Sequence, residues 1–161
     1  MESRRVVVTG IGALTPIGNN LQDYWNSLIN GVSGAAPITN FDASNFKTRF
    51  ACEVKNFEVT DFIHRKEARK LDRFSQYALV ATNEAFVDSG LDKDAIDSDR
   101  AGVIWGSGIG GMQTFQNEAS AFATGSGIPR YNPFFIPKLI SDIPAGHISI
   151  KYGFRGPNFT T

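Results

Sequence analysis

The sequence is poor in the features that mark secreted or membrane proteins. A single cysteine, Cys52, stands among 161 residues, so no disulfide can form within the chain, which fits a reducing compartment. No apolar run approaches the length that crosses a membrane, and the first residues, "MESRRVVV", lack the apolar stretch of a signal peptide. We therefore expect a soluble cytoplasmic protein that does not enter a membrane.

A net charge is also lacking. Sixteen basic and sixteen acidic residues cancel, whereas a general nucleic-acid binder carries a basic excess to neutralise phosphates. Nucleic acid is therefore not an expected partner. The composition that remains, 42% hydrophobic and 20% charged, is typical of a globular protein, and the length suffices for one domain with a buried core.

The order of apolar patterns predicts an α/β fold with a partly parallel sheet. Short β-branched runs predict buried strands at 5–9 and 101–105. Residues 126–137, rich in proline, are expected to form an irregular loop. Helical spacing and capping residues predict a helix from about Asn20 to Gly31. One further helix is predicted to start at Thr60 or Asp61, and another to start at Asp72 and stop at Gly90. Helical patterns also cover 112–123 and part of 138–153.

Two glycine turns raise the hypothesis of a nucleotide site. "GIG" at 10–12 follows the first predicted strand, and "GSGIGG" at 106–111 follows the second with G-x-G-x-x-G spacing. A bound phosphate needs a helix N-terminus directly after the turn, but residues 15–18 separate the first turn from its helix. The second turn lacks an acidic residue about twenty positions later to hold a ribose. Close approach between backbones is the better explanation of these glycines.

Five segments together resemble one family. They are "RRVVVTGIGALTPIGN", "RKEARKLDRFSQYAL", "GSGIGG", "NPFFIP" and "YGFRGPNFTT", and in unbroken order from Arg4 to Thr161 they resemble the N-terminal part of a β-ketoacyl-acyl-carrier-protein synthase of the type II (long-chain) kind. The resemblance implies a thiolase-like fold, of which residues 1–161 would form the N-terminal portion, an incomplete first half of a duplicated α/β/α/β/α architecture.

The same resemblance implies an activity. Such enzymes are homodimers that elongate fatty acids by decarboxylative Claisen condensation of malonyl-acyl carrier protein with an acyl-enzyme thioester, without a cofactor or metal. A helix N-terminus lowers the pKa of the nucleophilic thiol, and backbone N–H groups hold the oxyanion. The family pattern places the nucleophilic cysteine just after Thr161 and two catalytic histidines later, so residues 1–161 alone are expected to be inactive.

The cysteine and the two histidines of this sequence do not match those catalytic positions. Cys52 is expected to be a small buried side chain. His64 lies among charged residues and is expected to be solvated. For His147, a hydrogen-bonded structural role is favoured over that of a base.

Basic residues form the first set of candidate binding residues. Lys66, Arg69 and Lys70 are spaced to share one helix face. From sequence alone a solvated helix face would be the preferred interpretation. The resemblance instead implies that these three residues dock the acidic acyl carrier protein, with Arg130 joining them from the proline-rich loop.

Apolar residues form the second set. The resemblance implies that Ile109, in "GSGIGG", lines the acyl tunnel beside the nucleophile. Phe135, in "NPFFIP", would reach the tunnel across the dimer interface. Two alternatives stay open: a non-catalytic partner subunit of the same fold, like the chain-length factors that lack the cysteine, and a nucleotide-dependent reductase.

Overall fold

The computed structural model describes residues 4–125 and 130–161, which divide into two units. Unit 1 extends to Glu58 and includes Ala81–Gly90, and unit 2 comprises Val59–Val80 and Leu91–Thr161. Helix α3 (Arg73–Asp88) begins in unit 2 and ends in unit 1.

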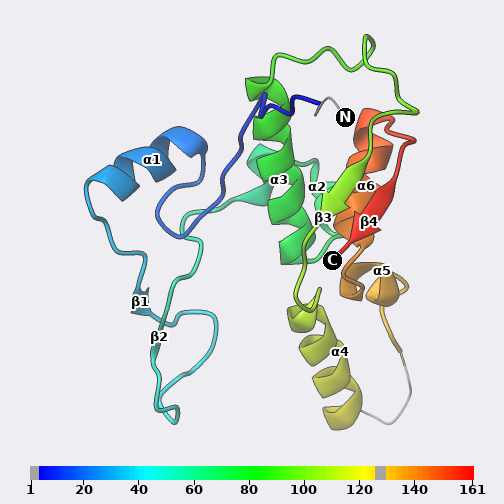
Figure 1. The fold of residues 1–161 in the computed structure, drawn as a ribbon. Helices are drawn as coiled ribbons and strands as arrows, with labels where there is room; N and C mark the ends of the chain where they lie inside the picture. Colours follow the sequence, from blue (N-terminus) through cyan, green and yellow to red (C-terminus); the bar gives the residue numbers. More distant parts are fainter. Residues whose placement is uncertain (1–3, 126–129) are drawn as a thin grey trace. The chain divides into compact units, whose positions relative to one another are not determined.

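Unit 1 contains helix α1 (Leu21–Ile29) and an antiparallel pair of two-residue strands, β1 (Ala36–Pro37) and β2 (Phe50–Ala51) (Figure 1). The predicted start and end of α1 are confirmed. The Asn20 side chain accepts a hydrogen bond from the backbone N–H of Asp23 at 2.8 Å, and Gly31 follows the helix with φ 64°. Both are ordinary ways to satisfy or redirect a helix end.

The glycines before α1 bring the chain directly onto the second half of α3. A Cβ atom on Gly12 would lie 1.9 Å from the carbonyl oxygen of Ala81, and one on Gly10 would lie 2.2 Å from that of Ala85. Since no side chain fits at these positions, glycine on one segment and alanine on the other permit the contact. The expected close approach of backbones is confirmed here.

The predicted strand at 5–9 is wrong. Residues 4–14 form no strand, and Val6 and Val8 are 90% and 80% exposed. A β-branched run becomes a strand only when a second strand accepts its backbone hydrogen bonds. No strand of the described residues pairs with this segment.

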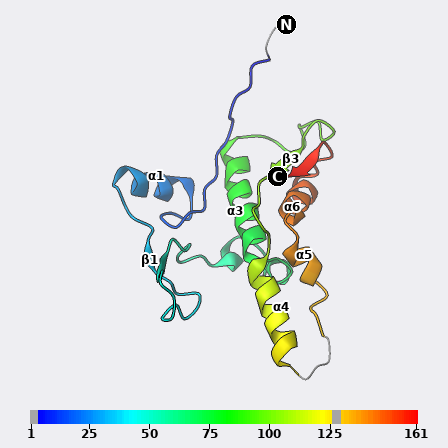
Figure 2. The same cartoon turned by 60° about the horizontal axis from the view of Figure 1, so that its bottom comes forward.

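Unit 2 is built on a parallel pair of strands, β3 (Val103–Trp105) and β4 (Asn158–Thr160), in the register Val103↔Asn158. Figures 1 and 2 show α6 (Ile143–Tyr152) packed beside both strands. The remaining elements of unit 2 are η1 (Val59–Asp61), α2 (Arg65–Ala68), the first half of α3, α4 (Met112–Thr124) and α5 (Phe135–Leu139).

The core of unit 2 combines alanines with larger apolar side chains. Ala78 of α3 and Ala145 of α6 are at most 1% exposed, and Ile148 is 4% exposed. Pro144 lies in the first turn of α6, where its missing N–H leaves no intrahelical bond unmade. Small residues at these positions let the helices approach closely.

Helix α5 lies within the segment predicted to be an irregular loop, so that prediction is wrong for residues 135–137. Asn132 forms a turn just before the helix: its side-chain oxygen accepts the N–H of Phe134, the N-cap residue, at 2.9 Å, and its carbonyl oxygen accepts that of Phe135 at 2.8 Å. Pro137 falls in the first turn, where no intrahelical N–H donor is required. Over residues 4–125 and 130–161, no helix combines the length and apolar character needed to cross a membrane.

Candidate functional site

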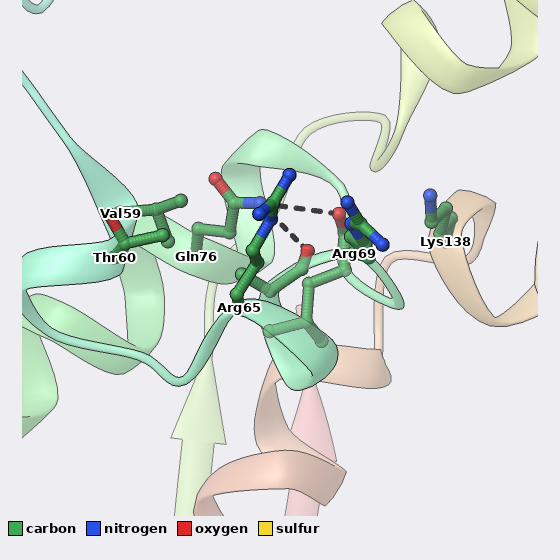
Figure 3. Close-up of a pocket in the computed structure, with 8 residues that line it drawn as sticks. Val59, Thr60, Arg65, Arg69, Gln76 and Lys138 are labelled. Carbon is green, nitrogen blue, oxygen red and sulfur yellow. Dashed lines mark hydrogen bonds between the residues drawn. The ribbon is translucent and has the colours of Figure 1, made fainter.

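Part of the basic cluster predicted from the sequence borders a pocket in unit 2. Helix α2 is a single turn capped by His64, whose Nδ1 accepts the N–H of Lys66 at 3.3 Å. The pocket has a volume of ≈ 420 Å³. Figure 3 shows its lining residues, which are Val59, Thr60, Arg65, Ala68, Arg69, Leu71, Gln76 and Lys138.

The pocket contains only one of the four predicted docking residues, Arg69. Lys70 forms an ion pair with Glu67, with 2.9 Å between Nζ and Oε1. The hydrogen bond from Lys70 also lowers the pKa of Glu67. Lys66 and Arg130 are exposed and do not line the pocket.

Arg65 and Lys138 line the pocket but were not predicted as site residues. Arg65 lies four positions before Arg69, which places both on one side of the α2 turn. The four-residue spacing from Arg69 could therefore have identified Arg65 as a site residue from the sequence. Lys138 comes from α5, and no local pattern connects that helix to α2.

Gln76 fixes the backbone beneath the pocket. This residue of α3 is 9% exposed, and its Nε2 donates to the carbonyl oxygens of Ala68 at 3.0 Å and Leu71 at 3.4 Å (Figure 3). Its Oε1 is buried and has no hydrogen-bond partner among the described residues. The turn between α2 and α3 is thereby held in place by a buried side chain.

Asp72, in the same turn, connects α3 to α4. It is 8% exposed and accepts the N–H of Phe74 at 3.3 Å, the N–H of Thr114 at 3.2 Å and the hydroxyl of Thr114. Both helix starts therefore use one carboxylate, a favourable position for a negative charge. The predicted start of a helix at Asp72 is confirmed.

The loop that carries Ile109 contacts the end of the helix that carries Phe135. Gly110 has φ 94°, and a Cβ on it would lie 2.2 Å from the carbonyl oxygen of Leu139. The N–H of Gly111 donates to the same oxygen at 2.9 Å. Ile109 itself is 69% exposed, and the Phe135 ring stacks on Tyr131 with centroids 5.6 Å apart.

The contacts of both glycine turns argue against the nucleotide hypothesis. In the first turn, the N–H of Ile11 donates to the carboxylate of Asp88 and that of Ala13 to Glu84, both at 2.8 Å. Carboxylates thus occupy the donors that a pyrophosphate would need, and they would repel it. In the second turn, the N–H of Gly111 is already bound to a carbonyl oxygen.

The structure corrects the expectation for the cysteine. Cys52 is exposed, because the two-residue strand before it ends at Ala51 and leaves the side chain outside the ladder. His64 is exposed as predicted. His147 is half-buried on α6. Burial lowers the pKa of His147, and the charge of Glu67 partly opposes this effect. The side-chain hydrogen bond expected for His147 is not found among the described residues. Within those same residues, no three His, Cys, Asp or Glu side chains group as metal ligands.

The chain belongs to the beta-ketoacyl synthase family, as the sequence predicted. The model of the beta-ketoacyl synthase N-terminal domain matches residues 3–161. The chain is 44% identical to 3-oxoacyl-[acyl-carrier-protein] synthase 2 of Synechocystis sp., over 100% of this chain and 38% of that protein. It is 46% identical to the Staphylococcus aureus protein of the same name, over 99% of this chain and 38% of the relative.

Solved structures establish the fold as the N-terminal portion of a thiolase-like fold. The ishigamide ketosynthase/chain length factor matches with a TM-score of 0.88 and 29% identity, over 98% of this chain and 40% of that one. A type II PKS acyl-carrier protein in complex with its ketosynthase matches with a TM-score of 0.76 and 27% identity, over 96% of this chain and 41% of that one. The chain thus spans about two fifths of the proteins that it resembles.

Proposed function

We propose that the full-length protein is a homodimeric, cytoplasmic 3-oxoacyl-acyl-carrier-protein synthase that elongates fatty acids. An acyl chain is transferred from its carrier to a cysteine thiolate as a thioester. Malonyl-carrier protein then loses CO₂, and the resulting carbanion attacks the thioester carbonyl, releasing the thiolate. The observation that carries this proposal is the identity of 44–47% to synthases of this name along 98–100% of the chain.

The role proposed for this part of the protein is to bind carrier and acyl chain. Lys66, Arg69, Lys70 and Arg130 form the basic docking set, and a charged rim of this kind speeds association with an acidic carrier. The structure with an acyl-carrier protein bound to its ketosynthase is consistent with such a partner.

Ile109 and Phe135 are the proposed acyl-tunnel residues. An apolar wall suits an alkyl chain, because each buried methylene contributes about 0.8 kcal/mol. The contact between the Ile109 loop and the end of α5 supports a shared site, since it fixes the loop against the helix that carries Phe135.

A second copy of the chain is the proposed partner for the exposed aromatic surface formed by α4, α5 and Tyr131. Tyr131 stacks on Phe122 and on Phe135, at 5.7 and 5.6 Å between centroids. Yet Phe122 and Tyr131 remain 46% and 48% exposed, and Ile136 is 55% exposed. Apolar surface of this kind favours burial in an interface.

The nucleophile is proposed to lie outside these 161 residues, and a preparation of them alone is expected to take up no acyl group. Cys52 is exposed and follows the two-residue strand β2, not the N-terminus of a helix. A reactive cysteine needs an electropositive site that lowers its pKa.

The test is a reconstituted condensation with the full-length protein. Acyl-carrier and ¹⁴C-malonyl-carrier substrates should yield a labelled 3-oxoacyl-carrier product. Labelled acyl-carrier alone should yield an acyl-enzyme, and hydroxylamine should release its label by cleaving the thioester. The likeness to a ketosynthase/chain length factor favours a non-catalytic subunit as the second candidate. Carrier binding without acylation or product would overturn the first candidate in favour of the second.

A further inference from the structure

We propose that the pocket between the α2 turn and α5 receives an acidic side chain of the carrier protein, held by Arg65, Arg69 and Lys138. These three residues are called the cation pocket below. The inference rests on the proposed function, and it assigns carrier recognition to Arg65 and Lys138, which the sequence did not single out.

Unpaired positive charge is the first argument. The ion pairs Lys70–Glu67 and Arg155–Asp99 do not involve any residue of the cation pocket. The three cations therefore repel one another, and neither of these ion pairs offsets that repulsion. An incoming carboxylate relieves that repulsion, whereas Lys70 already has a carboxylate partner.

The shape of the pocket is the second argument. Arg65 and Arg69 come from α2 and Lys138 from α5, so positive side chains border the hollow from two elements (Figure 3). A guanidinium presents two parallel N–H donors that match the two oxygens of a carboxylate. Val59, Ala68 and Leu71 supply apolar wall against which the methylene groups of an Asp or Glu side chain can pack.

Preorganisation is the third argument. Gln76 holds the carbonyl groups of Ala68 and Leu71, so the backbone between Arg65 and α3 is already ordered before a partner arrives. Binding then costs little backbone entropy. Lys138 is half-buried, which leaves less side-chain freedom to lose than a fully exposed lysine would have.

The experiment compares charge-neutralising variants of the full-length protein in carrier binding, measured by fluorescence anisotropy at low and at physiological salt. Arg65→Gln and Lys138→Gln should each raise the Kd about five-fold or more at low salt, and less at physiological salt. The Kd of Arg65→Lys should lie between those of the wild type and Arg65→Gln, because lysine keeps the positive charge and lacks the paired N–H donors of the guanidinium. Lys66→Gln, just outside the pocket, should raise the Kd less than either variant. Lys93→Gln is the control at an exposed lysine in the same unit.

A small anion provides an independent readout. Inorganic phosphate should displace the carrier from the wild type more effectively than chloride at equal ionic strength, and Lys138→Gln should abolish that difference. Thermal unfolding of each variant checks that the fold is retained.

The outcomes separate the pocket from the general docking proposal. If Lys66→Gln weakens binding as much as Lys138→Gln, and phosphate acts only through ionic strength, docking stands and the cation pocket is wrong. If Lys66, Arg69 and Lys70 variants as well as the pocket variants bind the carrier like wild type, the docking role itself is wrong.

Discussion

Replacing Asp72 with asparagine perturbs a single buried carboxylate on which two helices depend. Its three hydrogen bonds come from the N–H of Phe74 and from the N–H and hydroxyl of Thr114. All three donors face an ionised acceptor, and such bonds contribute about 1.5–3 kcal/mol each, twice the neutral value. Asparagine has one acceptor oxygen, so its NH₂ group must face a donor on one of the two sides.

We expect the amide to turn its oxygen toward Thr114, because this keeps two of the three hydrogen bonds and leaves only the N–H of Phe74 without a cap. Loss of an N-terminal cap costs about 0.5–2 kcal/mol, and weaker neutral bonds to Thr114 add about 1 kcal/mol. We therefore expect Asp72→Asn to lower the free energy of unfolding of the full-length protein by about 1.5–3 kcal/mol. Chemical denaturation at one fixed protein concentration measures it, because subunit association also adds stability.

Thr114→Val is the matched partner variant, since it removes the hydroxyl and keeps the shape. It should cost about 1–2 kcal/mol, and the double variant should show a coupling energy of about 1 kcal/mol or more between the two sites. A loss below about 0.5 kcal/mol for Asp72→Asn, or additive effects in the double variant, would refute the view that this carboxylate joins α3 to α4.

Three further outcomes are expected. Ile109→Phe in the full-length protein should slow elongation of long acyl primers about ten- to hundred-fold and spare short primers, because the added ring blocks the tunnel at a cost of about 1–3 kcal/mol. A steady-state assay with primers of different lengths measures this. Equal loss at all lengths would show that Ile109 supports the fold and does not line a tunnel. Gly111→Ala should lower the free energy of unfolding by about 1–3 kcal/mol, since its methyl would lie 2.1 Å from the carbonyl oxygen of Lys138, while Gly108→Ala, which meets nothing within 4 Å, should change it by less than about 0.5 kcal/mol. Burial lowers the pKa of His147, so the unfolded chain binds more protons than the folded chain, and the free energy of unfolding should fall as the pH drops below about 6.5. His147→Gln should remove this part of the pH dependence of denaturation curves. The same pH dependence in the variant and the wild type would contradict the prediction.

Local chemistry made the helix ends predictable. Asn20, Asp72, Gly31 and Gly90 act through bonds or dihedral angles within a few residues, and each lies where the sequence placed it. The strand at 5–9 was not predictable in this way, because pairing depends on a distant segment. Family resemblance, by contrast, identified the fold through residues in fixed order along the whole chain.

In the candidate site too, the residues set by local sequence could be predicted and those set by distant contacts could not. Arg69 could be found from the charge pattern of one helix, and Arg65 shares that pattern. Lys138 lines the pocket because α5 forms inside a segment whose prolines predicted a loop, after a turn at Asn132. Burial of Cys52 failed as a prediction because hydrophobic character does not show where a strand ends, and β2 ends at Ala51, one residue before it.

Helix α5 is only five residues long, about 7–8 Å from end to end, and it serves two neighbours at once. Its Lys138 side chain borders the cation pocket, and the carbonyl oxygens of Lys138 and Leu139 lie against the glycines that follow Ile109. The two proposals, carrier docking at the cation pocket and an acyl tunnel beside Ile109, therefore involve the same short helix. Under the proposed roles of the cation pocket and of Ile109, a substitution in α5 that changes acyl length is expected to change carrier affinity too, so variants at this helix should be screened for both properties.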